Sequence, residues 1–273
     1  MRTLQLAGRT VPVIGQGTWR MGEDPGQRAQ EVRALQQGLE HGLSLIDTAE
    51  MYGEGGAEEV VGQAIRGQRD KVVLVSKVYP HNASRQGVRE ACERSLRRLG
   101  TDHIDLYLLH WPGSEPLEET VAGFEALVAQ GKIHRWGVSN FDVADLQALA
   151  DTRCATNQVL YNPQARGIEF DLLPWAKAAE LPVMAYCPIA QGGGVLQHPA
   201  LLQVATRHRI TAAQACLAWV LRHPGMIAIP KASSTHHIAE NAAAADLHLD
   251  AEDLALIDQA FAPPRRKQSL SMV

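Results

Sequence analysis

The sequence predicts an α/β fold, a (β/α)8 (TIM) barrel with an N-terminal β-hairpin and an extra C-terminal helix. Short apolar runs alternate eight times with segments of helical periodicity. The residues that end these runs are spaced by 18 positions (Asn140 to Gln158) to 45 positions (Tyr186 to Lys231), and most intervals fit one strand, one helix and two short loops. A chain of 273 residues is a normal length for one barrel, so we expect a single domain over residues 1–273. A doubly wound sheet is the alternative, which eight strands without a central break in composition disfavour.

The strands begin with a predicted hairpin, residues 3–6 and 10–13, around the turn at Ala7, Gly8 and Arg9. The barrel strands follow as short apolar runs. They are expected at residues 13–19, 43–46, 72–77, 104–110, 136–139, 155–161, 183–187 and 226–230. Right-handed crossovers between such strands close a parallel barrel, whose active site forms at the carboxyl ends of the strands.

The helices are predicted from apolar stripes and from their end signals. One helix begins near Gln27 and stops at Gly42, Ser84 caps another, and Thr211 with Gln214 forms a capping box. Further helices are expected at residues 57–66, 117–130 and 236–244, after the cap Asp142, from Asp171 onward, and after Asp250 at the C-terminal end. The tail from Pro263 is polar and basic, and we expect its end to be mobile.

Composition excludes several classes of function. The net charge is −4, which gives no basic field for nucleic acid. No cysteine pair has CxxC spacing, which suits free thiols in a reducing cytosol. The first residues lack the apolar core of a signal peptide, and no apolar run approaches a membrane span. We therefore expect a cytoplasmic monomer that acts on a small molecule, without a nucleic-acid or membrane partner.

Polar residues with matching chemistry end three successive strands. Asp47, Lys77 and His110 each follow an apolar run, and Tyr52 comes five positions after Asp47. A carboxylate at the end of a buried strand is costly unless it is paired, and Lys77 is a cation in the equivalent position. Taken singly, each residue has an ordinary explanation, such as a salt bridge, a core histidine or a loop tyrosine. Four such types at successive barrel-strand ends favour an active site.

These four side chains suit the protonation of a carbonyl oxygen. The Tyr52 phenol, with an ordinary pKa of about 10, is a proton donor at neutral pH. A neighbouring Lys77 ammonium would stabilise the phenolate and lower the pKa of Tyr52, and Asp47 would hold that ammonium in place. A neutral His110 imidazole would donate a hydrogen bond to the substrate oxygen. The set therefore predicts carbonyl reduction, provided that a hydride donor binds nearby.

The sequence contains no standard nucleotide-binding motif. Gly15-Gln16-Gly17 lacks the third glycine of a Rossmann fingerprint, and no Walker A sequence occurs. The triplet Gly192-Gly193-Gly194 could cradle a pyrophosphate or be only a loop. Lys231 ends the eighth strand, where barrel enzymes often bind phosphate, whereas Tyr186 could stack on an aromatic ring or pack the barrel. No metal site is expected, because His236 and His237 are too close to chelate and the other histidines lack ligand spacing.

The chain resembles the aldo-keto reductase family from Gly15 to about Asn241. The most specific matches are residues 45–53 (LIDTAEMYG), 74–77 (LVSK), 105–110 (DLYLLH), 137–141 (GVSNF) and 229–231 (IPK). The resemblance implies an NADP-dependent oxidoreductase on a (β/α)8 barrel, with Tyr52 as the acid and Asp47, Lys77 and His110 as its partners. The pattern is most similar to small bacterial members that act on methylglyoxal and other simple aldehydes.

The resemblance also implies a set of binding residues. Ser139, Asn140 and Gln158 would hold the carboxamide of the cofactor, and Tyr186 would stack on the nicotinamide. The full implied set of cofactor contacts is Gly17, Thr18, Trp19, Asp47, Ser139, Asn140, Gln158, Tyr186, Pro188, Ile189, Gln191, Pro230, Lys231, Ala232, Ser233, His237, Glu240 and Asn241. The implied substrate contacts are Trp19, Tyr52, Tyr79, His110 and Trp111.

Two departures from the family pattern bear on specificity. Many relatives place a serine at Ala232 and an arginine at His237, and both usually touch the 2′-phosphate, so we expect NADPH binding with NADH possible at lower affinity. The tail after Phe261 is short, which implies an open pocket for small 2-oxoaldehydes.

A nucleotide-sensing regulatory barrel with slow turnover is the alternative, although such relatives carry extra interaction segments. A cofactor-free isomerase would have no need of the Tyr, Lys, His and Asp set.

Overall fold

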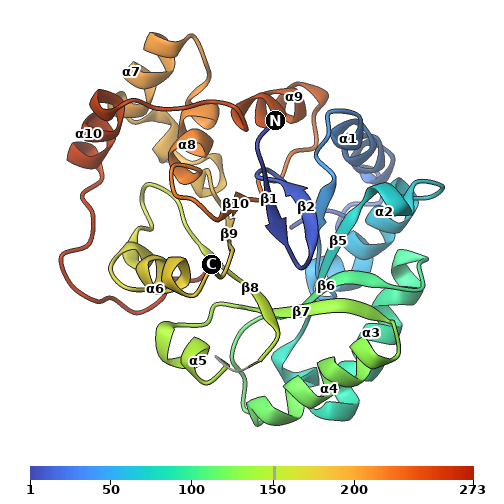
Figure 1. The fold of residues 1–273 in the computed structure, drawn as a ribbon. Coiled ribbons are helices and arrows are strands. Elements are labelled where there is room, and N and C mark those ends of the chain that lie inside the picture. Colours follow the sequence, from blue (N-terminus) through green and yellow to red (C-terminus); the bar gives the residue numbers. More distant parts are fainter. Residues whose placement is uncertain (150–151) are drawn as a thin grey trace.

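The barrel predicted from the sequence is present in the computed structural model, which describes residues 1–149 and 152–273. Over these residues, eight parallel strands form one sheet in chain order, surrounded by helices (Figure 1). The strands are β3 (Gln16–Gly17), β4 (Leu45–Asp47), β5 (Val73–Val78), β6 (Ile104–Leu109), β7 (Ile133–Ser139), β8 (Cys154–Leu160), β9 (Val183–Tyr186) and β10 (Met226–Ala228). Parallel bridges from Ile14 to Ala228 and from Gly17 to Lys231 join the first strand to the last. The sheet therefore closes, and the predicted fold class is confirmed.

The helices follow the predicted end signals closely. The Ser84 side chain accepts a hydrogen bond from the Gly87 N–H, and the capping box of Thr211 and Gln214 is formed. The helices around the sheet are α1 (Arg28–Glu40), α2 (Gly56–Ala64), α3 (Arg85–Leu99), α4 (Leu117–Ala129), α5 (Val143–Gln147), α6 (Leu172–Ala178), α8 (Ala212–Val220) and α9 (Thr235–Ala244). The extra C-terminal helix, α10 (Ala251–Ala260), is present as predicted.

One helix, α7 (Pro199–His208), was not predicted from the sequence. It lies in the longest interval between strand ends, the one that separates Tyr186 from Lys231. Its N-cap is His198, whose ring accepts a hydrogen bond from the Ala200 N–H. Histidine is not a usual N-cap residue, so the start of this helix carried no recognisable signal. Arg207 of α7 forms an ion pair with Asp250, which places α7 beside α10.

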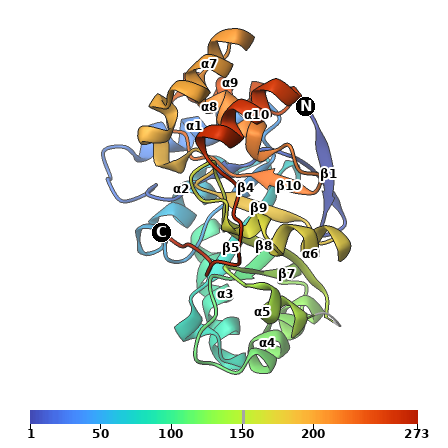
Figure 2. The same ribbon diagram turned by 90° about the vertical axis from the view of Figure 1, so that its left-hand side faces the viewer.

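The hairpin covers one end of the barrel, and the strand carboxyl ends open at the other. Strands β1 (Thr3–Leu6) and β2 (Arg9–Pro12) lie across the centre of the ring in Figure 1. Leu6 and Val11 of this hairpin pack against the apolar side chains that fill the barrel, Val73 and Val75 among them. Side chains alternate along a strand, so Lys77 continues the inward-facing row of β5. The hairpin and the C-terminal tail lie at opposite ends of the barrel (Figure 2).

In the part of the chain that the structure describes, no helix is long and apolar enough to cross a membrane.

Candidate active site

The four predicted catalytic residues meet at the carboxyl end of the barrel. The Lys77 ammonium is fully buried and donates to Asp47 Oδ2 and to the Thr48 carbonyl oxygen, each at 2.8 Å. It also lies 3.2 Å from the hydroxyl oxygen of Tyr52. The His110 ring contacts the Tyr52 ring edge to face, with 5.7 Å between ring centroids. The four side chains that the sequence placed at strand ends are therefore neighbours in the structure.

Asp47 is held from a second side. Its Oδ1 atom accepts a hydrogen bond of 2.8 Å from the Gln158 side-chain amide, while Oδ2 accepts from Lys77. Only 2% of Asp47 is exposed, so both carboxylate oxygens depend on protein donors. The pair therefore satisfies the rule that a buried charge needs a partner and further hydrogen bonds.

The electrostatics of the site favour a protonated phenol and a neutral imidazole. Burial, followed by the Asp47 carboxylate, raises the pKa of Tyr52 well above its ordinary value. We expected Lys77 to lower this pKa, but burial and the Asp47 charge raise it instead. Burial, followed by the Lys77 charge, lowers the pKa of His110 well below 6.5. Burial also lowers the pKa of Lys77, against the opposing effect of Asp47.

A cavity of about 930 Å³ opens over Tyr52 and extends to helix α9. Most of the predicted binding residues line it: Gly17, Thr18, Trp19, Asp47, Tyr52, His110, Trp111, Ser139, Asn140, Gln158, Tyr186, Pro188, Ile189, Gln191, Pro230, Lys231, His237, Glu240 and Asn241. One continuous space thus joins the candidate acid to the predicted phosphate-binding residues.

Four predicted residues are not among those that line the cavity. Lys77 lies behind Tyr52. Tyr79 packs edge to face against Trp111 with 5.9 Å between ring centroids, one layer behind the cavity wall. Ala232 and Ser233 follow Lys231, and the Ser233 carbonyl accepts a hydrogen bond from the Gln30 amide.

The predicted carboxamide-binding residues form one chain of hydrogen bonds. Tyr186 donates from its hydroxyl to Asn140 Oδ1 at 2.9 Å. The Asn140 amide donates to Ser139 Oγ and to the His110 carbonyl, and Ser139 Oγ donates to the Gln158 carbonyl at 2.8 Å. The side chains come from the ends of β7 and β9, and the two carbonyl groups come from residues of β8 and just after β6. These hydrogen bonds therefore connect the rim of the cavity across four strands.

Sequence reasoning missed several cavity residues, most notably those of the C-terminal tail. Met272 and Val273 line the cavity, although we expected the short tail to leave the pocket open. Lys267 forms ion pairs with Asp142 and Asp171, which hold the tail across the barrel mouth. These contacts join residues about a hundred positions apart, and no local pattern in the sequence indicates them. Of the triplet considered as a pyrophosphate cradle, Gly192 is among the lining residues. The other missed lining residues are Arg20, Met51, Cys187, Leu196, Gln197, Leu202, Thr211, Ala212, Ala213, Ile229 and His236.

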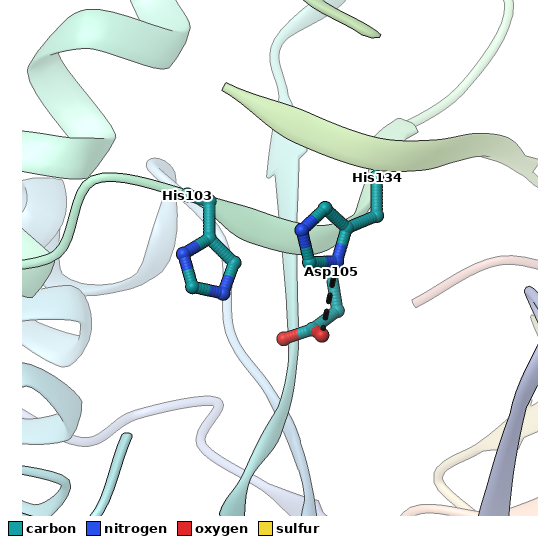
Figure 3. A group of neighbouring side chains, drawn as sticks. All are labelled: His103, Asp105 and His134. Atoms are coloured by element: carbon teal, nitrogen blue, oxygen red, sulfur yellow. Dashed lines mark ion pairs between the residues drawn. The ribbon is translucent and has the colours of Figure 1, made fainter. Parts of the chain in front are cut away.

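Two groups of possible metal ligands occur elsewhere among the described residues. His103, Asp105 and His134 lie at the amino ends of β6 and β7 (Figure 3), and His134 Nδ1 is 3.4 Å from Asp105 Oδ1. Asp105 also accepts from Arg9 at 2.6 Å and from Arg69 at 2.8 Å, so its charge is already compensated. In the second group, formed by His208, Asp250 and Asp253, Arg207 bonds both carboxylates. We interpret both groups as ion-pair clusters that sequence spacing could not reveal.

Comparison with known proteins agrees with this geometry. The model of the family described as the aldo/keto reductase family matches residues 13–262. Methylglyoxal reductase YeaE of Escherichia coli K12 is 54% identical, over 100% of this chain and 99% of that protein. Glyoxal reductase of Bacillus subtilis 168 is 35% identical, over 92% of this chain and 89% of that protein. The crystal structure of an aldo-keto reductase from Klebsiella pneumoniae in complex with NADPH is 58% identical, with a TM-score of 0.98 over 100% and 99% of the two chains.

Proposed function

The chain belongs to the aldo/keto reductase family, and on this premise we propose that it reduces small aldehydes and ketones with NADPH. The observation that carries the proposal is the buried Lys77 ammonium, 3.2 Å from the Tyr52 hydroxyl and 2.8 Å from Asp47, beside a large cavity. The relatives named above as methylglyoxal and glyoxal reductases support 2-oxoaldehydes as the substrate class. The regulatory alternative has no comparable support.

Tyr52 is the proposed general acid. Its hydroxyl donates a proton to the carbonyl oxygen as that oxygen gains negative charge, and the phenolate left behind faces the Lys77 ammonium. Asp47 keeps Lys77 charged and fixed in place. The neutral His110 imidazole donates a hydrogen bond to the same carbonyl oxygen and orients the carbonyl.

The residues that line the cavity fit NADPH, which supplies the hydride when it is bound. Ser139, Asn140 and Gln158 present amide and hydroxyl groups at the rim, next to the flat Tyr186 ring. At the other end of the cavity, Lys231 provides a cation that suits a phosphate group. We assign the carboxamide of the nicotinamide to Ser139, Asn140 and Gln158. The 2′-phosphate is assigned to Lys231 and His237. The adenine is assigned to the side of Glu240 and Asn241.

The pocket for the carbonyl suits small substrates. Trp19 and Trp111 give aromatic walls beside Tyr52, and Met272 of the tail closes part of the opening. This leaves little extended apolar cover for a steroid or a long aliphatic chain. The proposal includes a single-domain, cytoplasmic monomer. The net charge of −4 supports the absence of a nucleic-acid partner.

Steady-state oxidation of NADPH and NADH against a panel of carbonyl compounds tests the proposal. The panel contains methylglyoxal, simple unactivated aldehydes and a steroid ketone. We expect the highest kcat/KM for methylglyoxal with NADPH, because a short electrophilic carbonyl reaches Tyr52 without needing apolar cover. A preference of about a hundredfold or more for the bulky ketone would contradict the proposed substrate class.

A further inference from the structure

A buried carboxylate outside the cavity connects the strand of Lys77 to the turn that carries Tyr52. Glu58, in the first turn of α2, is 0% exposed. Its Oε1 atom accepts a hydrogen bond of 2.6 Å from Ser76 Oγ, and its Oε2 atom accepts one of 2.7 Å from Arg98 Nε. Glutamate is almost never fully buried without such partners, and burying it costs stability unless the partners are well placed. The position of Glu58 therefore calls for an explanation.

The first contact ties Glu58 to the strand that carries Lys77. Ser76 and Lys77 are consecutive residues of β5, and their side chains point to opposite faces of the sheet. Lys77 faces the barrel interior and Tyr52, whereas Ser76 faces outward to α2. A hydrogen bond from Ser76 to Glu58 thus fixes α2 against the backbone position that aims Lys77.

The second contact lies directly beneath the turn that carries Tyr52. This 3₁₀ turn, Tyr52–Gly55, runs straight into α2. Gly55 has a φ of 94°, and a Cβ atom added there would lie only 2.4 Å from Arg98 Nε, the atom that bonds Glu58. Helices α2 and α3 pack side by side outside β5 (Figure 1). The Glu58–Arg98 pair therefore supports the backbone three residues after Tyr52.

We propose that Glu58 is a positioning residue, which sets the Tyr52 hydroxyl against the Lys77 ammonium by tying α2 to Ser76. The inference rests on the proposed function, since it assigns Glu58 a part in the same proton transfer. Proton transfer from Tyr52 should be sensitive to the position of α2, because the contact between the Tyr52 hydroxyl and Lys77 is already long. It measures 3.2 Å, against 2.8 Å between Lys77 and Asp47. A displacement of about 1 Å between reacting groups costs roughly 10²-fold in rate.

The charge of Glu58 supports the same role. After the dominant effect of burial, which lowers the pKa of Lys77, Asp47 and then Glu58 act to raise that pKa. A purely structural ion pair between α2 and α3 is the competing explanation. It predicts a lower melting temperature on mutation, with kcat unchanged in the folded enzyme.

The experiment compares Ser76→Ala and Glu58→Gln with Glu59→Gln as a matched control. Glu59 is the next residue of α2, and its exposed side chain pairs with Arg28 of α1. For each full-length variant we would measure the melting temperature, the Kd for NADPH from fluorescence quenching, and kcat with methylglyoxal. We expect both test variants to lose about tenfold or more in kcat, with Kd within about twofold of wild type. The control should match the wild type in both measurements.

The double variant Ser76→Ala with Glu58→Gln tests whether the two residues affect kcat through the same hydrogen bond or independently. If Ser76 and Glu58 act through one hydrogen bond, Ser76→Ala should cause little further loss of kcat in the Glu58→Gln background. A kcat within twofold of wild type in both single variants, equal losses in Kd and kcat, or fully additive losses would each overturn the inference. Ser76→Ala leaves the Glu58–Arg98 pair intact. If Glu58→Gln does not fold, the kcat of Ser76→Ala alone therefore tests the positioning role of Glu58. A wild-type enzyme that binds NADPH but reduces no carbonyl compound refutes the proposed function instead.

Discussion

Replacing Lys77 with methionine should nearly abolish turnover. The variant keeps an unbranched side chain but removes the ammonium 3.2 Å from the Tyr52 hydroxyl. Two unit charges at this separation, with an effective dielectric constant of about 20, interact by roughly 5 kcal/mol. At about 1.4 kcal/mol per tenfold change in rate, the loss in kcat is on the order of 10³-fold or more. The assay is single-turnover oxidation of bound NADPH by methylglyoxal, which isolates the chemical step.

The same substitution should also destabilise the fold, and a second variant separates the two effects. Without Lys77, the described residues leave the buried Asp47 carboxylate only the hydrogen bond from Gln158, and an unpaired buried charge costs about 3–5 kcal/mol. The double variant Lys77→Met with Asp47→Asn removes that charge, so urea unfolding should show recovered stability while kcat stays low. A Lys77→Met enzyme with more than a tenth of wild-type kcat, the chemical step being rate-limiting, would refute the assigned role.

Three further outcomes are expected. Tyr52→Phe should lower kcat by ~10²–10⁴-fold, with the Kd for NADPH nearly unchanged; equal losses in both would show that Tyr52 binds the cofactor rather than acting as the acid. His237→Arg should raise the ratio of NADPH to NADH affinity in direct binding titrations, and an unchanged ratio would place His237 outside the phosphate site. Burial lowers the pKa of His110 well below 6.5 and that of His223 to about 4, so the unfolded chain binds more protons below pH 6.5. Stability should therefore fall as the pH drops from about 6.5 to 4, and His223→Gln should make the urea midpoint less dependent on pH in this range.

The four proposed catalytic residues could be found from the sequence because their side chains lie at or just after strand ends. An apolar run that stops at Asp47, and another that stops at Lys77, indicate both the strand boundary and the edge of the barrel where the side chain lies. Parallel strands bring their carboxyl ends together, so residues 30 positions apart become neighbours without any need to model the loops. The same regularity predicted strand-end positions for Asn140 and Gln158, whereas their proposed role in binding the carboxamide came from the family resemblance.

Features that depend on contacts between remote segments could not be predicted in this way. The tail reaches the cavity because Lys267 pairs with Asp142 and Asp171, and surface ion pairs leave no periodic signal in the sequence. The ion pair between Arg9 and Asp105 joins the hairpin to β6. A prediction made one strand at a time cannot indicate this contact, because the two residues belong to different elements. The sequence places Glu58 in the helix expected at residues 57–66 but gives no sign of its burial, because that burial follows from the packing of α2 on Ser76.

The raised pKa of Tyr52 is consistent with its proposed role as the general acid. In the free enzyme the ammonium of Lys77 is neutralised by Asp47, and burial keeps the phenol protonated. As the proton leaves, a new negative charge forms 3.2 Å from an ammonium that is already held in place by two other hydrogen bonds. Lys77 therefore interacts more strongly with the transition state than with the resting phenol, and no group has to reorient at that moment. This differential interaction, rather than a phenol that is already acidic at rest, is what the site contributes to proton transfer.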